Sequence, residues 1–285
     1  MPEGTKDVIP GVFSRHAEAY RDRVASAVAR GEARGRTRVV ELLAPAPGER
    51  VLDLGCGPGI LSLPLGEAVG AGGLVLAVDL AAGMLDVLRA AAPPQVAVAR
   101  MDMEALGARD AAVDAVAAGH SLQFCPDLDR ALGEARRVLR PGGRFALSLP
   151  RGGAASPAWD VLTEVFDRRL PAPAHPADGH ATRQLVGDDH RLVAAVAAAG
   201  FVAVALERVE EVSVYASPAE LVGMTLSWWA CAWRLESVPE PLRDAVQAEA
   251  LQALRDRLGD GPLTVPGTSV VVSARVPPGP RRPRP

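Results

Sequence analysis

The sequence predicts an α/β protein with a parallel sheet, because short apolar runs alternate with amphipathic stretches between residues 51 and 150. The expected strands are Val51–Leu54, Leu74–Asp79, Val96–Ala99, Ala115–Ala118 and Arg144–Leu149. The expected helices between them are Ile60–Val69, Ala82–Ala92 and Leu128–Leu139. Strand and helix in alternation predict βαβ units, which form a parallel sheet covered by helices on both faces.

The segments on either side of this block predict further helices and two late strands. Residues 14–44 have helical spacing of apolar side chains, with Ser14 as a cap and breaks at Gly31 and Gly35. Residues 151–187 are rich in Ala, Pro and Gly and predict an irregular excursion. The later expected elements are a helix over Asp188–Ala199, a strand over Phe201–Val214, helices within 217–258 and a strand over Thr264–Val276.

These patterns divide one domain into four parts. Residues 1–50 are expected to be N-terminal helices that cover a ligand site, and residues 51–150 to be the binding core. Residues 151–276 complete the sheet and contain a helical lid over 217–258. Residues 277–285 read PPGPRRPRP and predict a disordered tail, because they offer almost no apolar surface to pack.

Composition narrows the classes of partner. The chain has 285 residues, with 31 Lys and Arg against 34 Asp and Glu, for a net charge of −3. This balance argues against a nucleic-acid partner, which needs clustered positive charge. There is no apolar run of roughly 20 residues, so no membrane partner is expected. Three widely spaced cysteines without a CxxC pair predict reduced thiols, a cytoplasmic location and no metal site.

The segment from Val51 to Ile60 carries the strongest chemical signal. An apolar strand ends in Asp53 and runs into the loop Gly-Cys-Gly-Pro-Gly, in which glycines allow a ligand to approach the backbone. A carboxylate at this point would repel the pyrophosphate of a dinucleotide and favour a cationic ligand. S-adenosylmethionine carries a sulfonium and an ammonium group and has no phosphate. A purely structural turn is the alternative interpretation of the loop.

Acidic residues at the ends of the next two strands extend this hypothesis to an adenosine. Asp79 follows Gly59 by 20 residues and could accept hydrogen bonds from both ribose hydroxyls, or could only cap a helix. Asp102 could accept the adenine amine. Met103 could lie on the face of the base, or belong to the core.

Four motifs in this order resemble class I S-adenosylmethionine-dependent methyltransferases. They are DLGCGPG at 53–59, the strand that ends in Asp79, the stretch 101–106 and the RVLRPGG sequence at 137–143. The closest subgroup contains ubiquinone and menaquinone C-methyltransferases and natural-product methyltransferases, and the match covers about residues 14–150. The resemblance implies a Rossmann-like, doubly wound sheet of seven strands, the last of them antiparallel, with S-adenosylmethionine bound at the carboxyl ends of the first strands.

The resemblance also implies roles for individual residues. Asp53, Gly55, Gly57 and Gly59 would line the methionine end of the cofactor, with Cys56 as a small side chain among them. Asp79, Leu80 and Met84 would surround the ribose, and Asp102 and Met103 the adenine. Gly119 and His120, at the end of the fourth strand, would lie near the methionine backbone, and Tyr20 would cover the cofactor.

His120 is the candidate general base, because it lies where the transferred methyl group should point and an imidazole titrates near neutral pH. Alternatively it only lines the cofactor or hydrogen-bonds a loop. An apolar, aromatic substrate pocket is expected from Trp159, Met224, Trp228 and Trp229. The tryptophan-rich segment could instead form a homodimer interface or ordinary packing.

The sequence therefore predicts a methyltransferase that methylates oxygen or carbon of a small apolar or aromatic metabolite, in secondary-metabolite biosynthesis, and releases S-adenosylhomocysteine. A second hypothesis is a protein of the same fold that binds S-adenosylmethionine but catalyses cyclisation or rearrangement without methyl transfer. A nicotinamide-dependent reductase is a third reading, and Asp53 and Ile60 argue against it.

Overall fold

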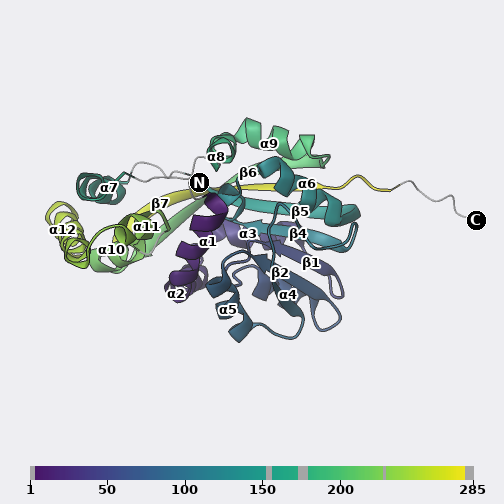
Figure 1. The fold of residues 1–285 in the computed structure, drawn as a ribbon, viewed down its shortest axis with the longest axis horizontal. Coiled ribbons are helices and arrows are strands. Elements are labelled where there is room, and N and C mark those ends of the chain that lie inside the picture. The colour runs from purple at the N-terminus through teal and green to yellow at the C-terminus, as the bar shows by residue number, and fades with distance from the viewer. Residues whose placement is uncertain (1–3, 152–155, 173–178, 227–228, 280–285) are drawn as a thin grey trace, which may run out of the picture.

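Across the described residues, a seven-stranded sheet in the order β3-β2-β1-β4-β5-β7-β6 forms the centre of the molecule (Figure 1). The computed structural model describes residues 4–151, 156–172, 179–226 and 229–279. The strands are β1 Arg50–Leu54, β2 Leu74–Asp79, β3 Val96–Arg100, β4 Val113–Gly119, β5 Leu139–Arg151, β6 Val202–Tyr215 and β7 Leu263–Arg275. Strands β1 to β5 pair in parallel, and β7 is antiparallel to both β5 and β6. The predicted fold class, with its antiparallel last strand, is confirmed.

Helices cover both faces of the parallel part of the sheet. Helices α3 (Arg34–Leu43), α4 (Ser62–Val69) and α5 (Ala82–Ala91) pack on one face, and α6 (Leu128–Val138) and α9 (Asp189–Ala198) on the other. Because neighbouring residues of a strand face opposite ways, Val51 joins the first cluster and Leu52 the second. Both are fully buried, which explains why β1 is apolar without alternation.

A second apolar core lies beyond the end of the main sheet. The antiparallel pair β6–β7 continues as far as the Tyr215–Leu263 register, past the other strands. Helices α7 (Pro157–Arg169), α10 (Pro218–Leu226), α11 (Trp229–Glu236) and α12 (Glu240–Leu258) gather around this extension and share a separate cluster. They form the lobe at the left of Figure 1.

The N-terminal part of the chain differs from the expected arrangement. Helix α1 (Thr5–Arg15) precedes α2 (Ala17–Ala29), so Ser14 lies inside a helix, where its hydroxyl donates to the Pro10 carbonyl, and is not a cap. Gly31, with φ +71°, does separate α2 from α3. Gly35 lies within α3 and does not break it.

The irregular excursion expected over 151–187 is also wrong in part. It contains α7 and the short helix α8 (His180–Val186). Helix α7 begins with a proline, which suits a first helical turn, and buries Val161, Leu162 and Val165 against the second core. The Pro-rich composition concealed this apolar periodicity.

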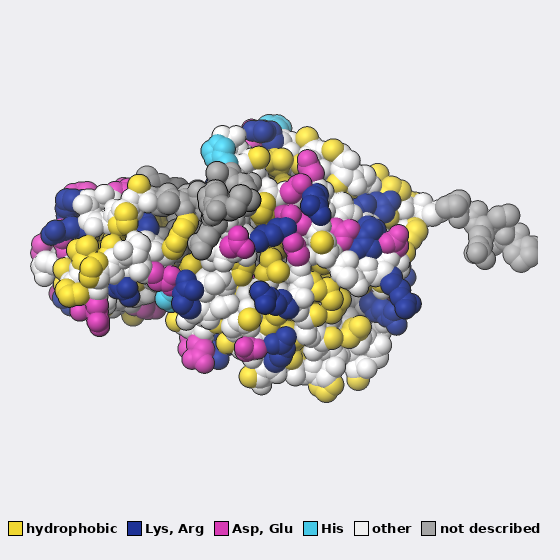
Figure 2. All heavy atoms as spheres, viewed as in Figure 1, with side chains coloured by type: hydrophobic (Ala, Val, Ile, Leu, Met, Phe, Trp, Pro, Cys, Tyr) yellow, Lys and Arg dark blue, Asp and Glu magenta, His cyan; other side chains and the backbone are white. Residues whose placement is uncertain are grey.

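Charges of both signs are interspersed over the face of the molecule shown in Figure 2. Within the described part of the chain, no helix is long and apolar enough to cross a membrane.

Gly35 allows α3 to approach β7 closely. A Cβ at position 35 would lie 2.4 Å from the Cβ of Ser269, which is fully buried. Gly35→Ala should therefore destabilise the fold by about 1–3 kcal/mol, the usual cost of overpacking. Urea denaturation measures the difference.

Gly133→Ala is the matched control. Gly133 lies in the exposed face of α6, and a Cβ there would meet nothing within 4 Å. Alanine is the better helix former, so this variant should unfold at the same or higher urea concentration. Equal stability of the two variants would contradict the close α3–β7 contact.

Candidate active site

One pocket opens at the carboxyl ends of β1, β2 and β4, which meet at the same edge of the parallel sheet. Such edges are where open α/β sheets bind ligands, because the loops that follow the strands converge there. Residues from three N-terminal helices, α1 to α3, complete the lining. Of the predicted cofactor-binding residues, the structure brings to this pocket Tyr20, Asp53, Gly55, Cys56, Gly57, Asp79, Leu80, Met84, Asp102, Met103, Gly119 and His120.

The glycine loop after β1 places each glycine differently. All three have positive φ, a conformation that favours glycine: +65° at Gly55, +53° at Gly57 and +99° at Gly59. A Cβ on Gly57 would face open space, so no neighbouring atom blocks the approach of a ligand on that side of its backbone. Gly59 does not line the pocket. A Cβ there would lie 2.4 Å from a methyl of Leu88, so Gly59 serves the packing of the loop on α5.

Asp53 is a carboxylate at the floor of the pocket with one oxygen unpaired. Its side chain is 1% exposed. The Ser62 hydroxyl donates to Oδ2 over 2.6 Å, and no donor among the described residues reaches the buried Oδ1. Burial raises the pKa of Asp53 to about 7, against the opposing effect of the Ser62 hydrogen bond. An unpaired, desolvated carboxylate of this kind fits a cationic ligand group.

Asp79, at the end of β2, closes the glycine loop onto the sheet. Its Oδ2 accepts the Gly57 N–H and its Oδ1 accepts the Ala81 N–H, both over 2.9 Å. Burial raises the pKa of this carboxyl, although these backbone hydrogen bonds oppose the rise. Each oxygen keeps a second lone pair, so the geometry is compatible with ribose hydroxyls as further donors.

Asp102 is part of an ion-pair cluster with Lys6, the single lysine of the chain. Lys6 Nζ donates to Asp102 Oδ2 and to Glu104 Oε2, each over 2.6 Å. Burial alone would lower the pKa of Lys6, but these hydrogen bonds outweigh it and raise the pKa. The cluster ties α1 to the loop after β3. The adenine contacts of Asp102 and Met103 stay predictions.

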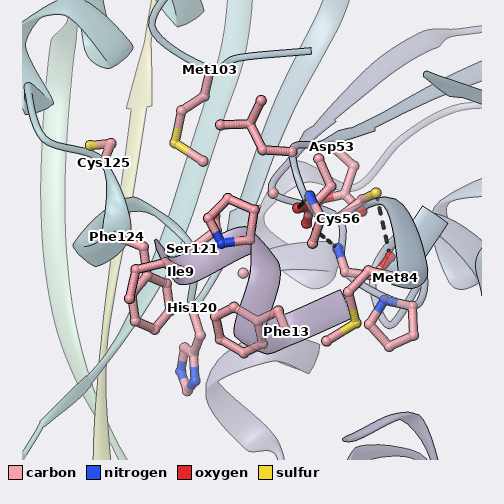
Figure 3. Close-up of a pocket in the computed structure, with 18 of the residues that line it drawn as sticks. Ile9, Phe13, Asp53, Cys56, Met84, Met103, His120, Ser121, Phe124 and Cys125 are labelled. Atoms are coloured by element: carbon pink, nitrogen blue, oxygen red, sulfur yellow. Dashed lines mark hydrogen bonds between the residues drawn. The ribbon is translucent and has the colours of Figure 1, made fainter. Parts of the chain in front are cut away.

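Aromatic side chains from α1 and α2 cover the pocket on one side. The ring of Phe13 packs edge-on against Tyr20 and against Phe124, with centroids 5.7 Å and 5.3 Å apart. Figure 3 shows Phe13 and Phe124 close to His120, with Met103 at the opposite end of the labelled residues. Sequence reasoning identified Tyr20 but missed α1 and Phe124. The apolar spacing of Ile9 and Phe13 was the available signal.

His120 follows β4 with an unusual backbone. Its φ is +54°, uncommon for a residue with a side chain and often found at functional sites. Its Nε2 lies 3.0 Å from the hydroxyl of Ser269 on β7. Burial lowers the pKa of His120 well below its ordinary value, and the nearby charge of Arg36 lowers it further. The imidazole is therefore neutral at neutral pH, the form that a general base requires.

Two of the four predicted substrate-binding residues, Trp159 and Met224, do not line this pocket. Met224 is buried in the second core, and Trp159 packs against the same cluster. The structure does not bring them to the pocket, because α7 and α10 pack around the extension of β6 and β7. Trp228 and the side chain of Trp229 lie outside the described residues. As for metals, no group of three or more His, Cys, Asp or Glu side chains that could hold an ion gathers within the described ranges.

Comparisons with known sequences identify the family of the chain. A family model described as "Methyltransferase domain" matches residues 52–147. Nocamycin O-methyltransferase of Saccharothrix syringae is 32% identical over 256 residues, which is 85% of this chain and 90% of that relative. The C-methyltransferase UbiE of Acidiphilium cryptum is 44% identical over 111 residues, but the match spans only 37% of this chain and 44% of UbiE.

Solved structures share the fold along most of the chain. A putative type II methyltransferase from Anaeromyxobacter dehalogenans is 26% identical, with a TM-score of 0.58, and the match covers 86% of this chain and 97% of that one. The [4+2]-cyclase SpnF is 21% identical, with a TM-score of 0.53, over 87% of this chain and 81% of SpnF. The likeness to SpnF is one of fold alone.

The buried carboxyl of Asp53 makes the stability of the ligand-free protein depend on pH. The folded protein holds this proton up to about pH 7, whereas the ordinary value is 3.8. Between these values the folded state binds more protons, so the free energy of unfolding falls as pH rises. Asp53→Asn removes this slope. The melting temperature of the variant minus that of the wild type should therefore be larger at about pH 8 than at about pH 5.

Thermal melting at both pH values checks this. Asp86→Asn is the control, because the Asp86 side chain is 72% exposed. It should shift the melting temperature little, and equally at both pH values. A pH-independent effect of Asp53→Asn would contradict the raised pKa.

Proposed function

Because this chain belongs to the family of S-adenosylmethionine-dependent methyltransferases, we propose that it methylates oxygen or carbon of a small, largely apolar or aromatic metabolite. The observation that carries the proposal is the buried Oδ1 of Asp53, which no donor among the described residues reaches. The same pocket contains Gly57, on which a Cβ would face open space. This arrangement suits the cationic methionine end of the cofactor. It would be repulsive to a pyrophosphate in the same position.

The residues that line the pocket would suit each part of S-adenosylmethionine. Asp53 and the backbone of Gly57 would hold the methionine portion, and Asp79 the ribose hydroxyls. Met84 and Met103 would contact the nucleoside, and Tyr20 would cover it. When bound, the cofactor supplies a methyl group on a sulfonium, an activated donor that needs little more than correct positioning of the acceptor.

The remaining wall of the pocket supports an aromatic or apolar acceptor. Ile9, Phe13 and Phe124 provide apolar surface, while His120 and Arg36 are polar groups among them. A pocket that is mostly apolar, with a few polar groups, orients a ring that bears a hydroxyl or an acidic carbon. Of the Trp and Met residues expected from the sequence, Trp159 and Met224 are not part of this wall.

We also propose that the reaction belongs to natural-product biosynthesis, which the similarity to nocamycin O-methyltransferase supports. A cytoplasmic location and a homodimer through the helical lobe stay predictions. Cyclisation or rearrangement without methyl transfer is the alternative, because SpnF, a cyclase, shares the fold. The two activities differ in whether the cofactor is consumed.

Asp79 gives a direct test of the nucleoside site. Asp79→Ala should weaken binding of S-adenosylhomocysteine by roughly 10- to 100-fold, since it removes charge-assisted hydrogen bonds to the ribose. Isothermal titration calorimetry measures the affinity, and circular dichroism checks the fold, because Asp79 also holds the loop. Asp86→Ala, the same change on the exposed face of α5, should leave the affinity unaltered. Equal affinities in all three proteins would exclude this site.

Turnover distinguishes the proposal from its alternative. The protein is incubated with S-adenosylmethionine and a panel of phenols, enols and carboxylic acids, and products are quantified by mass spectrometry. We expect one S-adenosylhomocysteine for each acceptor that gains a methyl group. An acceptor that is converted to an isomer, with the cofactor unchanged, would support cyclisation or rearrangement and refute methyl transfer.

A further inference from the structure

His120 is the first member of a chain of three hydrogen-bonded side chains that leads away from the pocket. Its Nε2 lies 3.0 Å from Ser269 Oγ, and the Ser269 hydroxyl donates to Glu211 Oε2 over 3.0 Å. The other carboxylate oxygen of Glu211 accepts the Gly35 N–H over 2.6 Å. The chain thus joins the end of β4, the middle of β7, β6 and the first turn of α3.

The direction of these hydrogen bonds determines the tautomer of His120. A carboxylate has only acceptor atoms, so the Ser269 hydroxyl must give its proton to Glu211. The Ser269 oxygen can then only accept from the imidazole, which places the ring proton of His120 on Nε2. In a neutral imidazole the other nitrogen, Nδ1, therefore carries the lone pair.

Nδ1 is the nitrogen that remains available for chemistry. Among the described residues none is hydrogen-bonded to it, and His120 lines the pocket. Figure 3 shows the imidazole beside Phe13, at the end of the labelled residues opposite Met103. The φ of +54° turns the chain at His120 directly after β4. Of the two ring nitrogens, one is thus held by β7 and the other is free.

We propose that Ser269 and Glu211 are positioning residues that hold His120 as the Nε2–H tautomer, so that Nδ1 can accept the proton of the methyl acceptor. The inference rests on the proposed methyl transfer and assigns the residues that orient its base. These residues are needed for acceptors that must lose a proton as they are methylated, namely hydroxyl groups and acidic carbons.

The proposed step conserves protons and electrons. The acceptor atom forms its new bond to the methyl carbon while the carbon–sulfur bond breaks, and that electron pair stays on sulfur. The acceptor proton moves to Nδ1 of His120. The imidazolium formed keeps its Nε2–H on Ser269, and the negative charge of Glu211 lies behind it. A carboxylate that acts in this way stabilises the imidazolium without becoming protonated.

The charged residue that faces His120 from α3 is Arg36. Arg36 lines the pocket and donates to the Tyr20 hydroxyl over 3.1 Å. Its positive charge adds to burial, which is the larger cause, in lowering the pKa of His120 and keeping the imidazole neutral before the reaction. It also favours an acceptor that develops negative charge on oxygen.

Glu211→Gln is the decisive variant because it reverses the chain without changing its shape. The Gly35 N–H still requires an acceptor, so the amide oxygen faces Gly35 and the amide N–H faces Ser269. The Ser269 hydroxyl must then donate to Nε2 of His120, which forces the proton onto Nδ1. We expect kcat to fall by roughly 100-fold or more, the usual contribution of a general base, with unchanged affinity for S-adenosylhomocysteine.

Nitrogen-15 NMR of the imidazole gives a readout that a purely structural role would not move. The wild-type spectrum should show His120 as the Nε2–H tautomer, and Glu211→Gln should show the Nδ1–H tautomer. Ser269→Ala breaks the same chain from its middle and should lower kcat without fixing either tautomer. Glu210→Gln, on the neighbouring exposed position of β6, is the matched control and should change neither kcat nor the spectrum.

The outcomes separate this inference from the proposed function. If Glu211→Gln or His120→Ala transfers methyl groups with the kcat of the wild type, the proposed roles of His120, Ser269 and Glu211 are wrong. The proposed methyltransferase function is then unaffected. An Nδ1–H tautomer in the wild-type protein also overturns these roles. If the wild type transfers no methyl group, the proposed function fails, and the NMR spectra of the wild type and Glu211→Gln still decide how His120 is held.

Discussion

A desolvated carboxylate at the end of the central strand is the constraint on which the rest of the site depends. Asp53 is enclosed by the sheet and the glycine loop, and one of its oxygens has no described donor. Such a group costs stability unless a cation compensates it. The loop backbone, the Asp79 hydrogen bond to Gly57 and the covering helices all surround this point. The pocket thus contains a buried carboxyl group, which suits a cationic ligand group.

The pocket combines segments that are far apart in the chain. Helices α1 and α2 provide the aromatic cover, and the ion pairs of Lys6 attach α1 to the loop after β3. Ser269 and Glu211, from the last two strands, reach His120 from behind. His120 and the two side chains behind it therefore come from opposite halves of the chain, and the antiparallel insertion of β7 beside β5 is what brings them together.

The parallel core was predictable because its signals are local. Buried strands read as continuous apolar runs, and β2 begins and ends at the predicted residues. The flanks were predicted less well. Gly35 suggests a helix break by its intrinsic preference, yet α3 tolerates it because only a residue without a Cβ fits against Ser269. Helix α7 was missed because its apolar face is recognised only against the second core.

By itself, the sequence determined the βαβ order, the glycine loop and the charge class of the ligand, since strand, loop and acidic residue lie within ten positions of one another. Tertiary structure decided which residues line the pocket. It moved Trp159 and Met224 into the second core, removed Gly59 from the pocket, and added Phe13, Arg36 and Phe124. Contacts between distant segments depend on how helices and strands pack, and no local pattern encodes a hydrogen bond such as that between His120 and Ser269.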